Sequence, residues 1–316
     1  MTGCSRFLCI MLIGTALLSA APAAAVDRSG FPLTVTDDQG IALTLAAKPQ
    51  RIVSLTLPTD EMLLSLVEKS RLVGITTFAM DRVLSNVVDL AADIPEKLTL
   101  NVEKVISLRP DLLLVAPWND STQVLLLRKA GVPVYMMSTG ATVEEIAQKI
   151  GRLAAMTGEA ERGAAVVEEM RRKVRLVEQK VATVPEAKRL RVLDYASWGG
   201  AQGRGSSWDE VVRRAGLINA ASQFSTDKWS QVPLSTEKLL TIDFDILMLS
   251  GGMYGNGRAS EPFERQFLRD PVLRGLKAVK EGHVYTIPES LKDTTSQYIA
   301  DAIAWLARTA YPELYR

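Results

Sequence analysis

The stretch TGEAERGAAVVEEMRRKVRLVEQKVATVP, residues 157–185, predicts one uninterrupted amphipathic helix. Its apolar residues recur in steps of three and four, which places them on one narrow face. They are Ala160, Ala164, Val167, Met170, Val174, Val177, Val181 and Val184. Thr157 is placed to cap the start of the helix, and Pro185 to end it. Such a helix would be roughly 39 Å long, which is the width of a small lobe.

The opposite face of this predicted helix is ionic. Glu168 and Arg172 stand four residues apart, as do Glu169 and Lys173, and this spacing allows ion pairs along a helix. A helix of this length is either an ordinary surface helix or a rigid connection between two lobes. The flanking sequence decides between them.

The length of 316 residues is enough for two lobes, each with its own core. A hydrophobic content of 47% and a formal net charge of +1 are typical of a soluble globular protein and provide no field that would attract nucleic acid. We therefore expect no nucleic-acid partner.

Residues 1–25 resemble a secretory signal, because Arg6 precedes an apolar run and Ala23 and Ala25 supply the small residues of a cleavage site near Ala25/Val26. The mature chain is then expected in the periplasm. Cys4 and Cys9 both lie in the signal, so the mature chain would have no disulfide and no cysteine ligand. No cysteine stands at the cleavage region, so we expect no lipid anchor.

Short β-rich runs alternate with helical patterns on both sides of the predicted helix, after a hairpin-like lead-in at 31–45. The predicted strands are 51–55, 72–76, 112–116, 132–138, 191–197, 245–250 and 284–288. The predicted helices are 59–67, 101–108, 121–130, 142–156, 207–215, 235–242 and 293–310. This alternation predicts parallel sheets with helices on both faces.

The two halves share one internal similarity, at an offset of 134 residues. NVEKVISLRPDLLLVA at 101–116 aligns with STEKLLTIDFDILMLS at 235–250. We therefore predict an α/β protein with an N-terminal lobe at 26–157, an interlobe helix at 158–184 and a C-terminal lobe at 185–316. Convergence of two unrelated segments on one helix–strand unit is the alternative.

Aromatic side chains gather in the loops after the predicted strands, where ligands of parallel α/β sheets bind. The loop residues are Phe78, Met80, Trp118, Asn119, Trp198, Trp229 and Tyr254. Loops leave such rings little core to fill, so we predict ligand contacts. The segment GRGSSW at 203–208 offers Arg204 to an anion, but the favoured interpretation is a simple turn into a helix.

Enzymatic motifs are missing from the sequence. His283 is the single histidine and stands at the start of a predicted strand, and neither a G-x-S-x-G elbow nor an H-E-x-x-H pair occurs. We expect no catalytic residues, no protein-held metal and no cofactor.

Taken together, six segments resemble the periplasmic binding proteins of ABC importers for ferric siderophores, haem and cobalamin. They are QRIVSL (50–55), NVEKVISLRPDLLLVA, the helix at 157–185, GRGSSW, LSTEKLLTIDFDILML (234–249) and GHVYTIP (282–288). The resemblance implies two Rossmann-like lobes joined by a single long α-helix, a ligand cleft between them, a monomer, and delivery to an inner-membrane permease with a cytoplasmic ATPase.

The same resemblance implies roles for particular residues. Loops that touch ligand in the family correspond to 56–63, beginning at Thr56, and to 78–81, although TLPTDEML and FAMD depart from the usual family patterns. Acids at the positions of Glu103 and Glu237, one in each lobe, would form salt bridges with the permease. Their alternative role is to complement the positive ends of their own helices.

The expected ligand is a small-molecule metal chelate, with a ferric siderophore first and cobalamin, another corrinoid or haem as alternatives. A flat tetrapyrrole would use Trp118, Trp198 and Trp229, whereas an anionic ferric complex would use Arg82, Arg204 and Arg258. A two-domain enzyme or a sensor that uses the same cleft remains a rival interpretation.

Overall fold

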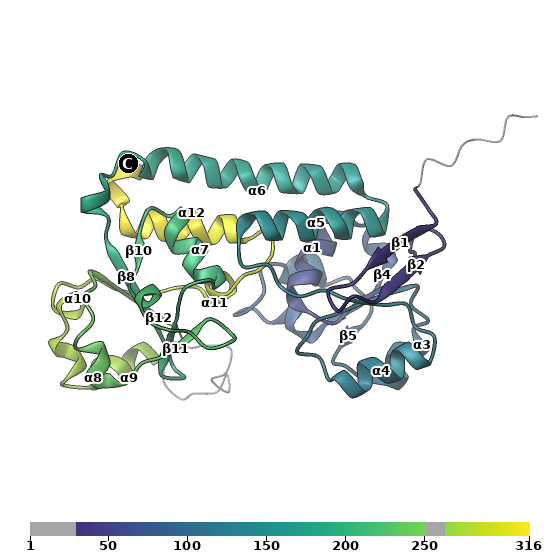
Figure 1. Cartoon of the computed structure of the whole chain (residues 1–316), viewed down its shortest axis with the longest axis horizontal. Coiled ribbons are helices and arrows are strands. Elements are labelled where there is room, and N and C mark those ends of the chain that lie inside the picture. Colours follow the sequence, from purple (N-terminus) through teal and green to yellow (C-terminus); the bar gives the residue numbers. More distant parts are fainter. Residues whose placement is uncertain (1–29, 251–262) are drawn as a thin grey trace, which may run out of the picture.

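The structure is a computed structural model, and it describes residues 30–250 and 263–316. Two β-sheets lie side by side, and a long helix, α6 (Ala160–Val181), runs past both of them (Figure 1). We call the sheet before α6 with its helices the N-terminal lobe, and the sheet after α6 with its helices the C-terminal lobe. The two-lobed α/β fold predicted from the sequence is confirmed, whereas the division at residues 157 and 185 stays a prediction.

The helix predicted at 157–185 begins later than predicted, because Thr157 belongs to the preceding helix. Thr157 does not cap α6 but is the last residue of α5 (Val143–Thr157), where its buried hydroxyl donates to the Leu153 carbonyl at 2.8 Å. Gly158 then adopts a left-handed conformation with φ 69°, which closes α5, and Glu159 stands at the start of α6. Glycine takes this conformation without strain, so it is the residue that separates the two helices.

The other end of α6 also differs from the prediction. The helix ends at Val181, because Thr183 and Val184 donate to carbonyls three residues back and so tighten the last turn before Pro185. With 22 residues, α6 is roughly 33 Å long.

The apolar face of α6 is confirmed for most of its length but shifts at its start. Met170, Val174, Val177 and Val181 are buried, as predicted, whereas Ala160 and Ala164 are exposed. Gly163 is buried in their place because α5 crosses there. A Cβ on Gly163 would lie 2.3 Å from the Cβ of Ala154.

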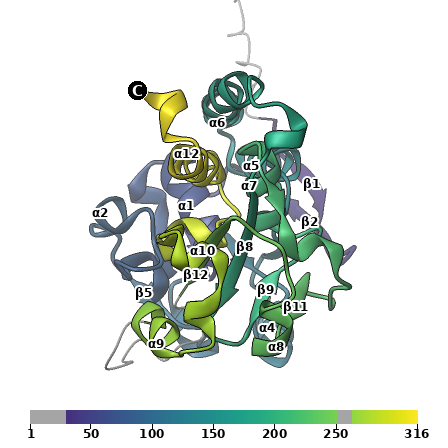
Figure 2. The same ribbon diagram turned by 90° about the vertical axis from the view of Figure 1, so that its left-hand side faces the viewer.

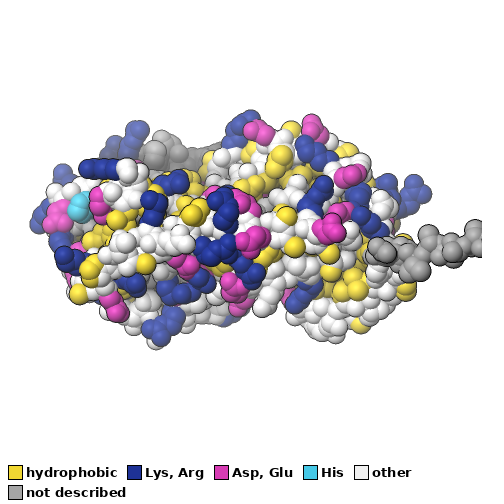
Figure 3. All heavy atoms as spheres, turned by 90° about the horizontal axis from the view of Figure 1, so that it is seen from above, with side chains coloured by type: hydrophobic (Ala, Val, Ile, Leu, Met, Phe, Trp, Pro, Cys, Tyr) yellow, Lys and Arg dark blue, Asp and Glu magenta, His cyan; other side chains and the backbone are white. Residues whose placement is uncertain are grey.

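The ionic face of α6 is confirmed, but its predicted pairs are wrong. Arg172 binds Glu169 at 2.7 Å, Arg175 binds Glu168 at 2.5 Å, and Lys173 reaches Asp301 of α12 (Ile299–Ala310) at 2.7 Å. Long flexible side chains can exchange partners at little cost on an exposed face. Figure 3 shows this face with charges of both signs intermingled.

The N-terminal lobe contains a parallel sheet in the order β5-β4-β3-β6-β7, and an antiparallel hairpin precedes it. The strands of this lobe are β1 (Leu33–Thr36), β2 (Ala42–Leu45), β3 (Ile52–Ser54), β4 (Leu72–Thr76), β5 (Lys97–Leu98), β6 (Leu112–Val115) and β7 (Val134–Met136). Its other helices are α1 (Leu57–Leu66), α2 (Val88–Ala91), α3 (Val102–Ser107) and α4 (Ser121–Lys129), with short 3₁₀ turns η1 (Lys69–Arg71) and η2 (Thr77–Met80). The hairpin and the parallel sheet are confirmed.

The C-terminal lobe has a mixed sheet instead of the predicted parallel one, in the order β11-β9-β8-β12-β13 with β10 beside β8. Its strands are β8 (Arg191–Ala196), β9 (Gly200–Gln202), β10 (Ile218–Asn219), β11 (Gln231–Pro233), β12 (Ile246–Ser250) and β13 (Val284–Thr286). The chain reverses directly after β8 through Gly199, at φ 86°, so β9 pairs antiparallel with β8, and β11 pairs antiparallel with β9.

The helices of the C-terminal lobe are shorter than predicted. They are α7 (Ser207–Arg214), α8 (Thr236–Leu239), α9 (Phe263–Arg269), α10 (Lys277–Lys280), α11 (Glu289–Lys292) and α12. The predicted helix 293–310 begins only at Ile299, and residues 293–298 form a connection between α11 and α12.

The predicted repeat is visible in matching contacts in the two lobes. The Asp111 carboxylate accepts hydrogen bonds from the N–H groups of Gln50 and Arg51 at 2.7 and 2.8 Å, and Asp245 accepts from Arg191 N–H at 2.9 Å. The guanidinium groups also match, since Arg51 donates to the carbonyl of residue 109 and Arg191 to that of residue 243. The two acids, like the two carbonyls, stand 134 residues apart in the sequence.

One hydrophobic core spans both lobes. Buried side chains of α1, α5, α6, α7 and α12 form a continuous cluster that includes Leu63, Ile150, Val174, Trp208 and Ile303. Figures 1 and 2 show α5, α6 and α12 on one side of the sheets, with α3, α4, α8 and α9 on the other. The lobes are therefore joined by a packed helical layer as well as by α6.

Candidate functional site

Large apolar side chains stand exposed in loops of both lobes. Phe78 is 55% exposed, Trp118 53% and Trp229 57%. Phe78 follows β4 and Trp118 follows β6, so both lie at the carboxyl edge of one parallel sheet. Because an exposed ring of this size contributes nothing to a core, these three positions are the strongest candidates for ligand contacts.

Local hydrogen bonds hold the two N-terminal loops in shape. The Thr76 hydroxyl accepts from Phe78 N–H at 2.8 Å and so caps η2. After β6, the Asn119 side chain accepts from Ala116 N–H at 2.8 Å and closes the turn that carries Trp118. Asn119 therefore supports the loop, and the tryptophan ring is left for solvent or ligand.

The two tryptophans of the C-terminal lobe differ from each other. Trp198 is half-buried, and its ring lies against Gly200, where an added Cβ would fall 1.9 Å from a ring carbon. Trp229 is exposed on a turn in which Asp227 accepts from the N–H groups of Trp229 and Gln231, at 2.8 and 2.9 Å. Trp198 thus packs within its lobe, whereas Trp229 presents most of its ring.

Thr56 is buried, and its hydroxyl has structural partners. It accepts from Thr59 N–H as the cap of α1, and it lies 2.6 Å from the Thr59 hydroxyl, which also contacts Ser54. This network leaves the hydroxyl little capacity to bind a ligand. Contact between ligand and Thr56 stays a prediction, and the structure assigns this residue to the start of α1.

The segment GRGSSW is a turn into α7, which was the simpler of its two interpretations. Ser206 caps α7 by accepting from Asp209 N–H at 3.1 Å, and Trp208 is fully buried in the shared core. The N–H groups of Gly203 and Gly205 donate to Ser230 and Asp209, so they do not form an empty anion cradle. Arg204 is exposed and remains the cation of this turn.

Glu103 and Glu237 occupy equivalent exposed positions in the first turns of α3 and α8. Asn101 and Ser235 cap these helices by accepting from the N–H groups three residues on, at 2.9 and 3.3 Å. A hydrogen bond from Ser235 holds the pKa of Glu237 below its ordinary value. Figure 1 shows α3 and α8 at opposite ends of the molecule, on the side away from α6.

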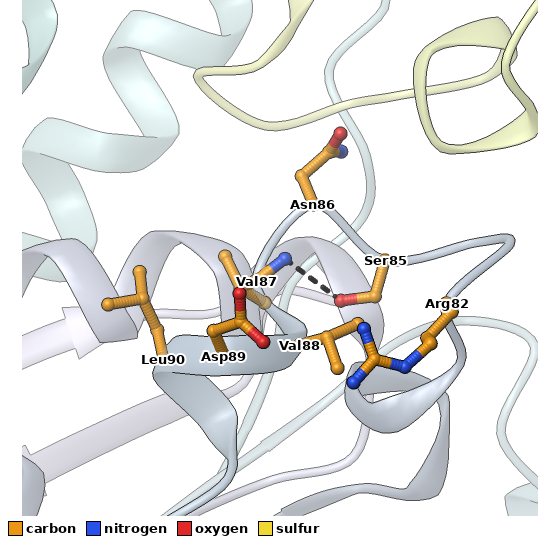
Figure 4. A pocket seen from close by; sticks show the side chains of 7 residues that line it. All are labelled: Arg82, Ser85, Asn86, Val87, Val88, Asp89 and Leu90. Atoms are coloured by element: carbon orange, nitrogen blue, oxygen red, sulfur yellow. Dashed lines mark hydrogen bonds between the residues drawn. The ribbon is translucent and has the colours of Figure 1, made fainter.

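A pocket of about 360 Å³ lies beside the loop that follows η2, lined by Arg82 and residues 85–90 (Figure 4). Arg82 is exposed, whereas the Asn86 side chain points away from the other lining residues, towards the C-terminal segment of the chain. The sequence analysis named Arg82 but did not find this pocket. Its lining residues lie close together in the sequence, but they form no recognisable ligand-binding motif.

Protein-held metal has no evident site in residues 30–250 and 263–316, where no group of three or more His, Cys, Asp or Glu side chains comes together. His283 is exposed beside Glu281, 3.7 Å away, and precedes β13. Since β13 runs parallel to β12, this imidazole lies at the edge opposite the carboxyl ends of those strands. Tyr254, Arg258 and the predicted signal at 1–25 lie outside the described residues.

Two similar α/β lobes with exposed aromatic side chains in their loops define a ligand-binding protein. The sequence profile of the periplasmic binding protein family matches residues 52–291, so the chain belongs to that family. Within the described residues, no helix is long and apolar enough to cross a membrane.

Individual proteins support the same assignment. A cobalamin-binding protein of Halobacterium salinarum is 27% identical over 255 residues, which cover 77% of this chain and 68% of that protein. An uncharacterised ABC transporter substrate-binding lipoprotein of Bacillus subtilis is 23% identical over 292 residues, covering 90% and 88%. The molybdate-bound periplasmic protein MolA of Haemophilus influenzae shares the fold, with a TM-score of 0.73, 20% identity and coverage of 90% and 92%. The family match and the substrate-binding lipoprotein confirm the expectation of a binding protein rather than an enzyme.

Proposed function

We propose that this chain captures a corrinoid such as cobalamin between its lobes and delivers it to an ABC permease. The observation that carries the proposal is the exposure of Phe78, Trp118 and Trp229, each by more than half, in loops of both lobes. A corrinoid offers a broad, partly apolar surface that such rings cover well. The cobalamin-binding relative in Halobacterium salinarum supports this chemistry ahead of the other chelates.

A ferric siderophore, the first expectation from sequence, is the second candidate. Arg82 and Arg204 favour it, because both are exposed near the aromatic loops and both could bind an anionic complex. Haem is less well served, since His283 lies at the wrong edge of its sheet to act as an axial ligand.

Delivery would use the two exposed acids, Glu103 and Glu237. Each stands in the first turn of a helix, one in each lobe, so the pair could meet two cationic sites on a permease at once. We place the protein in the periplasm as a monomer, released by cleavage near Ala25/Val26 and without a lipid anchor, and served by a permease with a cytoplasmic ATPase.

Titration with three chelates tests the ligand. Tryptophan fluorescence and calorimetry would be followed while cyanocobalamin, haemin and a ferric hydroxamate are added to separate samples. We expect cyanocobalamin to bind most tightly, and Trp118→Ala to weaken that binding by about 1–3 kcal/mol. Trp305→Phe is the control, because Trp305 packs in α12 against the shared core. Tighter binding of the ferric hydroxamate than of cyanocobalamin would reject the corrinoid.

A further inference from the structure

The connection between α11 and α12 joins the two lobes through polar contacts. Asn86, in the loop before α2, donates its side-chain N–H to the Ser290 carbonyl at 2.8 Å. Gln297 donates to the Glu61 carbonyl at 2.8 Å and to the Ser65 hydroxyl at 3.0 Å. In each contact one partner precedes α6 and the other follows it, 204 to 236 residues later in the sequence. These are therefore contacts between the two lobes.

The Glu61 carboxylate lies at the centre of this junction. It is 3% exposed, and its two oxygens accept from Asn86 N–H at 3.1 Å, from the Asn86 amide at 2.9 Å, and from the Ser296 hydroxyl. No cation is among these partners. Hydrogen bonds from two lobes therefore converge on one buried acid.

The ionisable neighbours of Glu61 do not neutralise it. Burial raises the pKa of Glu61 above its ordinary value, and the hydrogen bonds of Ser296 and Asn86 oppose that rise. Asp60 stands next to it on α1, and Tyr298 faces it from the start of α12, where burial and then the Glu61 charge raise the pKa of Tyr298 to about 12. The carboxylate thus depends on its hydrogen-bond donors.

At its other end, the connection is anchored in the core of the C-terminal lobe. Lys292 of α11 lies 3.0 Å from the Asp194 carboxylate on β8, and both side chains are buried. Burial raises the pKa of Asp194. Burial also acts to lower the pKa of Lys292, but the charges and hydrogen bonds of Asp194 and Asp293 together outweigh it and raise that pKa. We treat the pair as ionic, because both the ammonium and Gln202 N–H donate to this carboxyl.

We propose that residues 289–298 form a polar tether that sets the separation of the lobes in the free protein, with Glu61 as its positioning residue. Apolar packing resists separation of the lobes but is not directional, whereas hydrogen bonds fix both distance and angle. Asn86 lies in the loop that follows η2, which carries Phe78 and Met80. The tether therefore connects β8 to the loop beside a candidate ligand wall.

Distance measurement on the free protein tests the tether without any ligand. Mature protein that lacks residues 1–25 contains no cysteine, so Leu125→Cys and Leu240→Cys would place two spin labels, one on α4 and one after α8. Both leucines are exposed. We expect Asn86→Ala with Ser296→Ala to broaden the label distance distribution while circular dichroism stays native. Ser70→Ala with Gln179→Ala, at exposed positions, is the control. An unchanged distribution in the folded tether variant would overturn the proposal.

A second measurement tests whether the tether holds the lobes in the geometry that binds ligand. This measurement rests on the proposed function. If the tether variant holds the binding geometry only about a tenth of the time, its affinity for cyanocobalamin should fall about tenfold. Equal affinity in the tether variant and the control would show that the tether does not shape the site. If the parent protein fails to bind cyanocobalamin, the proposed ligand is wrong, and the label distances alone decide on the tether.

Discussion

The N-terminal lobe holds a fully buried aspartate, Asp60, and the C-terminal lobe holds another, Asp194. Asp60 accepts from Thr76 N–H at 3.0 Å, and its second oxygen has no partner. Asp194 faces the Lys292 ammonium at 3.0 Å. One lobe thus buries a carboxyl without a cation, and the other buries an ion pair.

This difference shows how each lobe reduces the free-energy cost of burying a carboxyl group. Burial raises the pKa of Asp60 well above its ordinary value, which favours the neutral form of this carboxyl. Asp194 keeps its charge because Lys292 supplies the opposite one, and Lys292 also fixes α11 to β8. A buried acid in this fold can therefore be a local support for a strand end or part of a connection between lobes.

The largest effect should come from removing the cation. Lys292→Ala leaves the Asp194 carboxylate buried and unpaired, which should cost about 3–5 kcal/mol of unfolding free energy in urea denaturation. Lys277→Ala is the control, since its pair with Asp245 is exposed, and little change is expected there. A loss no greater than that of the control would mean that the Asp194–Lys292 pair is not ionic.

The repeated contacts at Asp111 and Asp245 offer a sharper comparison. Asp111 accepts from two backbone N–H groups and Asp245 from one, so Asp111→Ala should cost about 2 kcal/mol and Asp245→Ala about half as much. Urea denaturation of both variants measures this. Equal costs would show that the second backbone hydrogen bond of Asp111 adds nothing to stability.

Substitutions of Trp118 and Trp198 should distinguish a role in ligand binding from a role in stability. Both were expected from sequence to contact ligand, but Trp198 packs on Gly200 whereas Trp118 is exposed. Trp118→Ala should therefore weaken cyanocobalamin binding by about 1–3 kcal/mol with no loss of stability, and Trp198→Ala should also lower the melting temperature. If Trp118→Ala lowers the melting temperature as much as Trp198→Ala does, this distinction is wrong.

The sequence predicted central strands and most helices because period and capping residues are local signals. It failed at the start of α6, where Thr157 precedes acidic residues and so resembles a helix cap. The deciding feature was Gly158, whose left-handed conformation ends α5. The strands β9 and β11 were missed because their sequences, GAQ and QVP, contain glycine and proline, which are uncommon in strands.

Candidate ligand-binding residues could be predicted from the sequence where they directly follow a strand. Trp118 could be named because it stands just after a buried apolar run. The junction of Glu61, Asn86 and Ser296 could not, because its three parts are brought together only by the packing of α1 against the C-terminal segment. A single sequence contains no signal for such a contact.

The buried carboxyl of Asp60 should make the stability of the protein depend on pH. Its pKa is raised in the folded protein, so its contribution to stability is fully present below the ordinary aspartate pKa and is lost as pH rises towards the raised value. Asp60→Asn stays neutral and can still accept from Thr76 N–H. We expect this variant to gain stability over the parent as pH increases, in urea denaturation at several pH values. A constant difference across pH would contradict the raised pKa.

The smallest structural effect should come from the matched acids, although it tests the proposed transport role most directly. Glu103 and Glu237 are exposed, and the capping contacts of Asn101 and Ser235 do not depend on them, so Glu103→Arg and Glu237→Arg should each shift the melting temperature by about 2 °C or less. Binding of cyanocobalamin should also be unchanged, because both residues lie on first helical turns rather than in the aromatic loops.

With a reconstituted permease, the same reversals should impair ligand-stimulated ATPase activity. The double variant should be worst, because two weak contacts held at a fixed separation bind far better together than either does alone. Glu161→Arg, exposed in the first turn of α6, is a matched control that keeps the change of charge but lies outside the proposed contacts. Should Glu161→Arg impair the ATPase equally, the effect is one of net charge. If Glu103→Arg and Glu237→Arg destabilise the isolated protein and leave the ATPase untouched, these acids serve only their own helices, and the like construction of the two lobes has no part in docking.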